Sequence, residues 1–464
     1  MMCRLRLAPW LLWLLLMGCS AVPGLKPFQG EVPARFKEAP AGVSATATSS
    51  TRDRAGWWTV LRDPVLDDLQ AQLLQGNQSL QALTAQNRQA RAALAAAQAS
   101  LWPSLNLNAG VGRSANQLTS PKGTSYSVSA PLSWELDVWG RIDAQAAAAQ
   151  AGLQASQDDL AAARLSLQTT LVQTYLSLRT AERQEQVLRA AEMAYQRFVT
   201  LTQYRYDAGV VSASDVAQAQ TQYKTTQAQR IEVGTQRAQL AHALAVLVGR
   251  SPSDLQVPAL NASALQAWPP AVPDLPALIP AGVLAQRPDI QAAKRRVEAA
   301  NAQIGVARAA FFPSVTFAAS AGYRNTDLSS LINASNQFWS IGPSLALSLF
   351  DGGQRRAARA QAEAVLDQTI ANYRQTVLAS FQDIEDNLVA AVQLKDQAQA
   401  QQEALDAARK NLDITQAQYQ AGTASALNLI LAQTTTLTAE RTLLDLQTRS
   451  WLAHNKLMGS GLAF

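Results

Sequence analysis

Two histidines are the residues of this chain best suited to acid–base catalysis, and they occupy matching positions in a repeated sequence. His242 and His454 each follow a Leu-Ala dipeptide. A catalytic histidine needs a nucleophile or a second base as its partner, and none recurs beside both copies. The two cysteines and two histidines of the chain also leave few ligands for a metal centre. The sequence therefore predicts no catalytic residue, no metal and no cofactor, and a structural contact kept at both histidines.

Cys19 is the other candidate for chemistry, because it follows a short apolar run. Two arginines and then the apolar stretch Leu7–Gly18 predict a signal peptide over residues 1–18. The sequence Leu-Met-Gly-Cys-Ser at its end resembles the bacterial lipobox. That resemblance implies that Cys19 becomes the first mature residue and carries a lipid. Ser20, in place of an aspartate, then favours the outer membrane. The alternative is a cysteine that only lies near an ordinary cleavage site.

Charge and hydropathy exclude several classes of protein. Charged residues make up 16% of the 464 residues, and the net charge of +5 is spread along the chain without a basic run. Nucleic-acid binding is therefore not expected. After the N-terminus, no apolar run reaches the roughly 18 residues that a spanning helix needs.

The longest regular pattern is a rod between Gln354 and Ala421, which contains no glycine and no proline. Ile370, Val377 and Ile384 lie seven residues apart, and a second apolar row is offset from them by three or four. This heptad pattern predicts a coiled coil. One helix of this length would be roughly 100 Å long, so it must pack against similar rods. A second glycine- and proline-free rod, Leu153–Ala208, has the same pattern.

The chain carries an internal duplication. The phrase Tyr-x-Ala-Gly-x-x-Ser-Ala begins at Tyr206 and again at Tyr419, 213 residues later. Pro103 and Pro313 both lie between an aromatic residue and a serine, 210 residues apart. Matches at a nearly constant offset predict two similar halves.

Alternating apolar and small polar residues follow each of these prolines. Tyr126–Val138 alternates over 13 residues, and the stretches around Phe317 and Ile341 repeat the pattern. Period-two alternation predicts β-strands, here over residues 104–114, 125–138, 314–324 and 337–350.

The uncharged polar face of these strands suggests a transmembrane barrel more than a soluble sandwich, which is the alternative. Four strands cannot close a barrel, and an open sheet edge does not occur in lipid, so the chain must oligomerise. The residues expected to face lipid are Val128, Leu132, Leu345 and Leu347. Those expected to face water are Ser127, Ser129, Ser133, Ser344 and Ser348, with Glu135 and Asp137 as solvated lumen acids rather than a catalytic pair.

The expected fold is an internally duplicated α+β membrane protein. Its parts are a signal peptide (1–18), an extended lipid-anchored segment (19–62), a first repeat (63–249), a proline-rich linker (250–287) and a second repeat (288–464). Short helices are predicted at about 63–75, 79–101 and 275–286, and long helices at about 143–206, 212–248, 354–421 and 424–458. Gly209 and Gly422 suit the left-handed residue that ends a helix.

These motifs resemble those of the outer membrane factor family, the TolC-like group, in its lipoprotein branch typified by OprM and NodT. Two further motifs carry the resemblance: Leu-Asp-Val-Trp-Gly-Arg ending at Arg141, and Leu-Phe-Asp-Gly-Gly ending at Gly353. The resemblance covers essentially the whole mature chain. It implies a homotrimer with a twelve-stranded barrel in the outer membrane and a twelve-helix periplasmic tunnel.

That resemblance also implies a function and partners. The chain would be a passive efflux duct docked to a periplasmic adaptor and an inner-membrane pump, of the resistance-nodulation-division type. A structural cell-envelope rod or adhesin is the alternative from another class. An adaptor is a further alternative, but it should have one helical hairpin and soluble β domains.

The resemblance places a periplasmic gate at the two hairpin turns. In the family, polar contacts between hairpin tips close the duct, and Asp215 stands at the polar position after the first turn. At the second turn Asn428 and Leu431 replace the family's aspartates, so an apolar constriction of Leu427 and Leu431 is expected. Tyr206 and Tyr419 lie near the ends of the two long helices, which places the Tyr419 hydroxyl within reach of a hydrogen bond to Asp215. The alternative is that Asp215 only caps its own helix.

Overall fold

The computed structural model describes residues 36–37, 56–116, 120–273, 284 and 286–460. Cys19 and the predicted signal peptide lie outside these residues, and so does most of the helix predicted at 275–286. The chain divides into two compact units, and each unit draws segments from both halves of the sequence. The first unit holds 83–159 and 288–376, and the second holds 31–82, 160–287 and 377–464.

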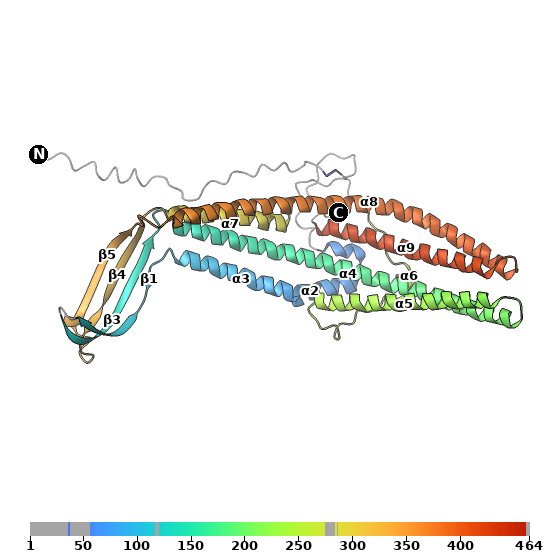
Figure 1. Ribbon diagram of the computed structural model, residues 1–464, viewed down its shortest axis with the longest axis horizontal. Coiled ribbons are helices and arrows are strands. Elements are labelled where there is room, and N and C mark those ends of the chain that lie inside the picture. Colours follow the sequence, from blue (N-terminus) through green and yellow to red (C-terminus); the bar gives the residue numbers. More distant parts are fainter. Residues whose placement is uncertain (1–35, 38–55, 117–119, 274–283, 285, 461–464) are drawn as a thin grey trace. The chain divides into compact units, whose positions relative to one another are not determined.

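The first unit contains one antiparallel sheet and the helices that enter and leave it (Figure 1). Its strands are β1 (Ser104–Leu105), β2 (Asn108–Asn116), β3 (Ser120–Leu136), β4 (Ser314–Asn325) and β5 (Gln337–Ala346). β1 and β2 both pair with β3, so the order across the sheet is β1/β2, β3, β4, β5. The sheet is therefore four strands wide, with β1/β2 at one edge and β5 at the other.

The strands differ from their predicted bounds at several ends. The first predicted strand is divided into β1 and β2, and β3 begins at Ser120 rather than near residue 125. β5 ends at Ala346, where it pairs with Ser314 at the start of β4. The predicted extension to residue 350 is wrong because β4 offers no backbone partner beyond that pair.

Eight helices of the described residues complete the chain, with a 3-10 turn η3 (Ala334–Asn336) between β4 and β5. They are α2 (Pro64–Gly76), α3 (Gln78–Ala99), α4 (Arg141–Asp207), α5 (Ala213–Leu247), α6 (Ala262–Gln266), α7 (Pro288–Ala309), α8 (Gln354–Gln420) and α9 (Ala426–Gly459). α4 and α8 have 67 residues each, and each is therefore roughly 100 Å long. A 3-10 helix η1 (Trp57–Leu61) lies where an extended segment was predicted, so that prediction is wrong there. Among the described residues, no helix is long and apolar enough to span a membrane.

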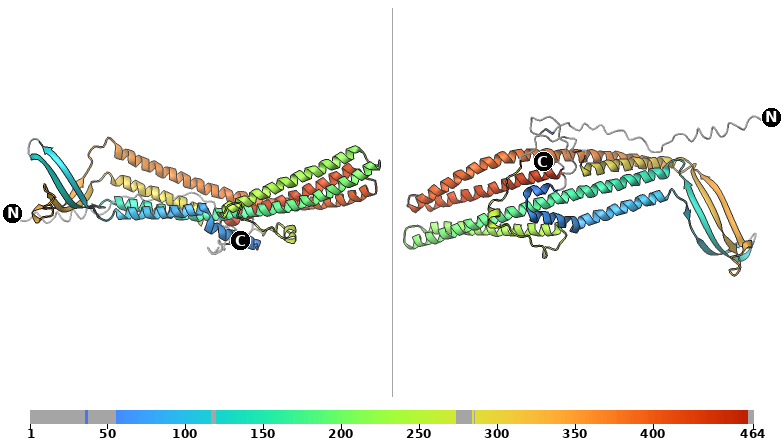
Figure 2. Two further views of the ribbon diagram at one scale, coloured as in Figure 1. Left: turned by 90° about the horizontal axis from the view of Figure 1, so that it is seen from below. Right: turned by 180° about the vertical axis from the view of Figure 1, so that it is seen from behind.

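In the second unit α4–α5 and α8–α9 form two long hairpins that lie side by side (Figure 2). The core between them at one end buries leucines of α2, α4 and α5, including Leu66, Leu171 and Leu244, at 0% exposure. Burying a leucine stabilises the fold by about 1.5–3 kcal/mol. The indole of Trp57 donates to Asn455 at 3.0 Å, and so fixes η1 against α9.

A junction of backbone against backbone joins α2 and α3 to the end of α5. The Asn77 side chain accepts from the Leu80 amide at 3.0 Å and donates to the Leu247 carbonyl at 2.8 Å. It therefore caps the start of α3 and the end of α5 together. Gly249 has φ 76°, and a Cβ there would lie 2.0 Å from the Gly76 carbonyl oxygen, so only glycine fits.

Candidate functional site at the hairpin turns and the sheet

Both hairpin turns end their first helix with a left-handed glycine. Gly209 follows α4 with φ 73°, and Gly422 follows α8 with φ 80°. The Val210 amide reaches back to the Arg205 carbonyl at 2.8 Å, and the Thr423 amide reaches the Gln418 carbonyl at 2.9 Å. These are the bonds of a Schellman ending, so the repeated phrase of the sequence gives the same turn twice.

Asp215 is held by its own helix. The Ser212 hydroxyl accepts from the Asp215 amide at 3.2 Å, and the Asp215 carboxylate accepts from the Ser212 amide and hydroxyl at 3.0 and 2.8 Å. This is a capping box. At the second turn Ser425 caps α9 by accepting from the Asn428 amide at 3.2 Å.

Tyr419 lies in an apolar cluster rather than beside Asp215. Its ring is 4% exposed, packs 5.5 Å from the ring of Phe198, and lies under the Arg205 guanidinium at 4.7 Å. Its hydroxyl has no hydrogen-bond partner among the residues that the structure describes. The predicted bond between Tyr419 and Asp215 is therefore wrong for the chain as described, because the capping box already satisfies the carboxylate.

The other predicted gate residues lie on the outside of this cluster. Tyr206 is 44% exposed, Leu427 48% and Leu431 56%, and Asn428 is also exposed. Leu427 and Leu431 are one helical turn apart, so they form an apolar strip on the face of α9 away from the buried Ile430. The structure thus leaves an unpartnered apolar surface close to both turns.

Ion pairs join α4 to α5 within the first hairpin. Glu192 of α4 accepts from Arg230 of α5 at 2.6 Å. Glu182, 5% exposed, contacts both Arg237 of α5 at 3.1 Å and the fully buried Arg179 at 2.8 Å. Phe198, Arg205 and these pairs were not predicted; the only signal in the sequence is the i, i+3 spacing of Arg179 and Glu182.

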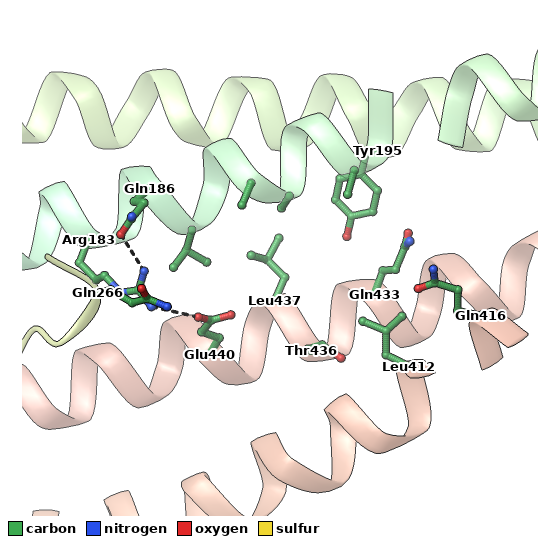
Figure 3. A pocket seen from close by; sticks show the side chains of 14 residues that line it. Arg183, Gln186, Tyr195, Gln266, Leu412, Gln416, Gln433, Thr436, Leu437 and Glu440 are labelled. Atoms are coloured by element: carbon green, nitrogen blue, oxygen red, sulfur yellow. Dashed lines mark hydrogen bonds and ion pairs between the residues drawn. The ribbon is translucent and has the colours of Figure 1, made fainter. Parts of the chain in front are cut away.

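A groove of about 430 Å³ separates the two hairpins within the second unit. Figure 3 shows Arg183 of α4 facing Glu440 of α9 across it, at 3.5 Å, and the Tyr195 hydroxyl pointing into it. Its other polar groups are mostly glutamine amides. Among the described residues, no group of three or more His, Cys, Asp or Glu side chains could hold a metal ion. The histidines also differ, since His454 is buried with Nδ1 2.9 Å from the Ser450 carbonyl whereas His242 is exposed. The contact expected in both copies is therefore found in one.

The register of the sheet sorts its residues onto two faces. Residues paired directly across antiparallel strands share a face. One face is apolar, with the pairs Val128–Tyr323, Ala130–Ala321, Trp134–Phe317, Val315–Leu345 and Ala319–Ile341. The opposite face is small and polar, with the pairs Ser127–Arg324, Ser129–Gly322, Ser133–Ala318, Thr316–Ser344 and Ser320–Ser340.

Acidic side chains make hydrogen bonds and ion pairs where the strands meet the helices. Asp137 caps α4 by accepting from the amides of Ile142 and Asp143 at 3.0 and 2.7 Å. It is therefore a helix cap rather than a lumen acid as predicted. Glu135 forms a bidentate pair with Arg141, at 2.9 and 2.8 Å. After β5, the pKa of Asp351 is held below its usual value by the hydrogen bond from the Arg355 side chain.

A two-faced sheet continued by paired 67-residue helices, all duplicated, is the architecture of a TolC-like outer membrane channel. The sequence model of the outer membrane efflux protein family matches residues 69–250 and 279–460, one stretch in each half. This chain belongs to the outer membrane efflux protein family.

Relatives match over nearly the whole chain. The cation efflux system protein CusC of Escherichia coli K12 is 30% identical over 443 residues, covering 95% of each chain. The toluene efflux pump outer membrane protein TtgF of Pseudomonas putida is 31% identical, covering 93% of this chain and 91% of that one. The open-state crystal structure of the Neisseria gonorrhoeae MtrE outer membrane channel matches with a TM-score of 0.82 and 28% identity, covering 95% of this chain and 98% of that one. The predicted family and fold class are confirmed.

Proposed function

We propose that three copies of this chain form the outer-membrane channel of a tripartite efflux system. The channel is a passive duct that leads cargo through the outer membrane and performs no chemistry of its own. The observation that carries the proposal is the sheet of the first unit, whose register separates one apolar face from one small, polar face. Lipid outside and water inside a barrel require that separation.

Closure of the sheet requires further copies. Among the described residues, β1/β2 and β5 have no partner strand on their outer sides, and unpaired backbone groups in lipid cost several kcal/mol each. Because the two edges differ, copies must pair head to tail, which closes a ring. Two copies would give eight strands and an interior filled by side chains. Three copies give twelve strands, the number that the family resemblance implies.

The partners follow from the same family. The long hairpins end in turns that would meet a periplasmic adaptor, which connects the duct to an inner-membrane pump of the resistance-nodulation-division type. Two relatives of nearly equal similarity are named for cations and for toluene. Similarity over nearly the whole chain therefore does not identify the cargo of this one.

The proposal also includes a lipid anchor in the outer membrane. The lipobox-like sequence before Cys19 supports acylation at that residue. Mass spectrometry of the mature N-terminus tests it, and a mature chain that begins elsewhere without lipid contradicts it.

The gate is proposed at the hairpin turns, after Gly209 and Gly422. In this chain the exposed Leu427 and Leu431 would form the constriction, with Tyr206 and Asn428 at its rim. Tyr419 and Asp215 would stabilise the turns without lining the constriction. Tyr419 is buried in the apolar cluster, and Asp215 forms the capping box of α5.

Variants of these residues test the gate in planar bilayers. Leu431→Ala should raise the resting conductance, because it shortens the apolar strip. Tyr419→Phe should leave the resting conductance unchanged, because the hydroxyl makes no hydrogen bond to any described residue. Parental conductance in Leu431→Ala and in Leu427→Ala, with the oligomer intact, contradicts the apolar gate.

Mass and conductance test the proposed function itself. Native mass spectrometry in detergent should give three protomers, and the same sample should conduct ions when inserted into a planar bilayer. A stable oligomer that never conducts, even with Leu427 and Leu431 both changed to alanine, supports a structural rod instead. A native mass of one or two protomers refutes the channel.

A further inference from the structure

The small, polar face of the sheet carries very little charge. Among its described side chains in β2 to β5, the charged residues are Glu135 and Arg324, and the others are serine, glycine, alanine, threonine, asparagine, proline and Phe338. Glu135 lies next to the helices and is neutralised by the bidentate pair with Arg141. Arg324 lies one residue from the opposite end of β4, and no carboxylate of the described residues pairs with it.

Arg324 is held in position by an aromatic ring. Its guanidinium carbon lies 5.2 Å from the centre of the Phe338 ring. Phe338 of β5 is the register partner of Gly322, two residues before Arg324 on the same face. Gly322 has no side chain to separate them, so the guanidinium reaches the ring across the strands. A cation over a phenyl ring is favoured without losing its charge, and the side chain is kept over the polar face.

We propose that Arg324, supported by Phe338, is an anion-selecting site at the end of the duct far from the helices. The proposal rests on the proposed function, because only a closed barrel places this face around a lumen. In a ring of three copies the site becomes three guanidinium groups facing one water column. Rings of arginine favour anions in pores, and the ligands here are small inorganic anions and the anionic groups of passing cargo.

The size of the effect follows from Coulomb's law. One unit charge about 6 Å from an ion in water changes the local concentration of that ion about three-fold. The effect has opposite sign for cations and anions, so their ratio changes up to about ten-fold at low salt. Screening shortens this reach at high salt, because the Debye length falls to about 3 Å at 1 M.

The test is the reversal potential of the purified protein in a planar bilayer under a ten-fold KCl gradient. The parent should prefer chloride. Arg324→Gln should lower the chloride-to-potassium permeability ratio at least about three-fold, and Arg324→Glu should reverse the preference. Phe338→Leu should weaken the preference in part, because the guanidinium loses its support.

Arg113 offers a matched control. It lies at the same end of the sheet, but its register partner Thr124 shares the apolar face with Tyr126. Arg113→Gln should therefore leave the permeability ratio unchanged.

Each outcome has a distinct meaning. An equal shift in Arg113→Gln and Arg324→Gln overturns the assignment of Arg324 to the lumen. A conducting trimer in which Arg324→Glu has parental selectivity overturns the anion site and leaves the channel intact. A parent protein that does not conduct after the gate leucines are removed overturns the proposed function instead.

Discussion

Ala130 lies at the middle of the apolar face of β3, directly across from Ala321 of β4. Tyr126 and Trp134 lie four residues to either side on the same face. The distance between them is about 26 Å along the strand, or about 20 Å along the membrane normal at a tilt near 40°. The segment between the two aromatic side chains therefore spans most of the ~25 Å apolar band of a bacterial barrel. Ala130→Arg places a guanidinium at the middle of that band.

The expected cost of Ala130→Arg is about 2–4 kcal/mol per chain, the cost of a midplane arginine on the lipid face. A barrel of three chains contains three such arginines, so its free energy of unfolding should fall by roughly 6–12 kcal/mol. Because the replaced alanine has only a methyl side chain, little packing is lost, and the measured change reports the cost of the arginine. Ser129→Arg is the matched control, because Ser129 is adjacent, lies on the opposite face, and pairs with Gly322, which leaves room.

The assay is urea unfolding of the protein in lipid vesicles, followed by the gel mobility of the folded oligomer. The unfolding midpoint should fall sharply for Ala130→Arg. It should fall much less for Ser129→Arg, since water solvates that side chain. Equal losses, or a larger loss for Ser129→Arg, would refute the assignment of the two faces.

Three further predictions concern stability away from the lipid. Gly249→Ala should destabilise by roughly 1–3 kcal/mol in thermal unfolding, because its Cβ would collide with the backbone of α2; Gly234→Ala, in open space within α5, should be neutral or stabilising by up to about 1 kcal/mol. Glu182→Gln should cost about 3–5 kcal/mol, because it leaves the buried Arg179 without a full counter-charge, and no loss in chemical denaturation would contradict this. The lowered pKa of Asp351 stabilises the fold above the ordinary value of 3.8, and this contribution is lost as the pH falls through the lower folded pKa. Asp351→Asn should therefore be less stable than the parent at pH 7, and the difference should vanish under acid; a constant difference across that range argues against the linkage.

The faces of the strands could be read from the sequence because side-chain direction in a strand has a period of two. Val128, Leu132 and Leu345 share one face of the sheet, and Ser129 and Ser344 share the other. The end of β5 could not be read in this way. Alternation continues past Ala346 through Leu347 and Leu349, but pairing depends on the neighbouring strand, which has already begun at Ser314.

The contacts at the turns were harder to predict because they depend on competition between partners. Asp215 lies close in sequence to Ser212, and the local capping box satisfies it before any distant tyrosine can. Phe198 and Tyr419 are far apart in sequence, and only packing of the two hairpins brings their rings together. The bond between Trp57 and Asn455 likewise joins residues 398 positions apart.

The unlike edges of the sheet have a genetic consequence. Every closed ring needs the β2 edge and the β5 edge of each copy, so a chain whose β5 cannot pair with the next copy prevents closure of any ring that it enters. If a cell makes intact and edge-defective chains in equal amounts and they mix at random, only about one eighth of the three-chain rings contain three intact copies. Such an allele should be dominant, whereas a deletion of the same gene should be recessive.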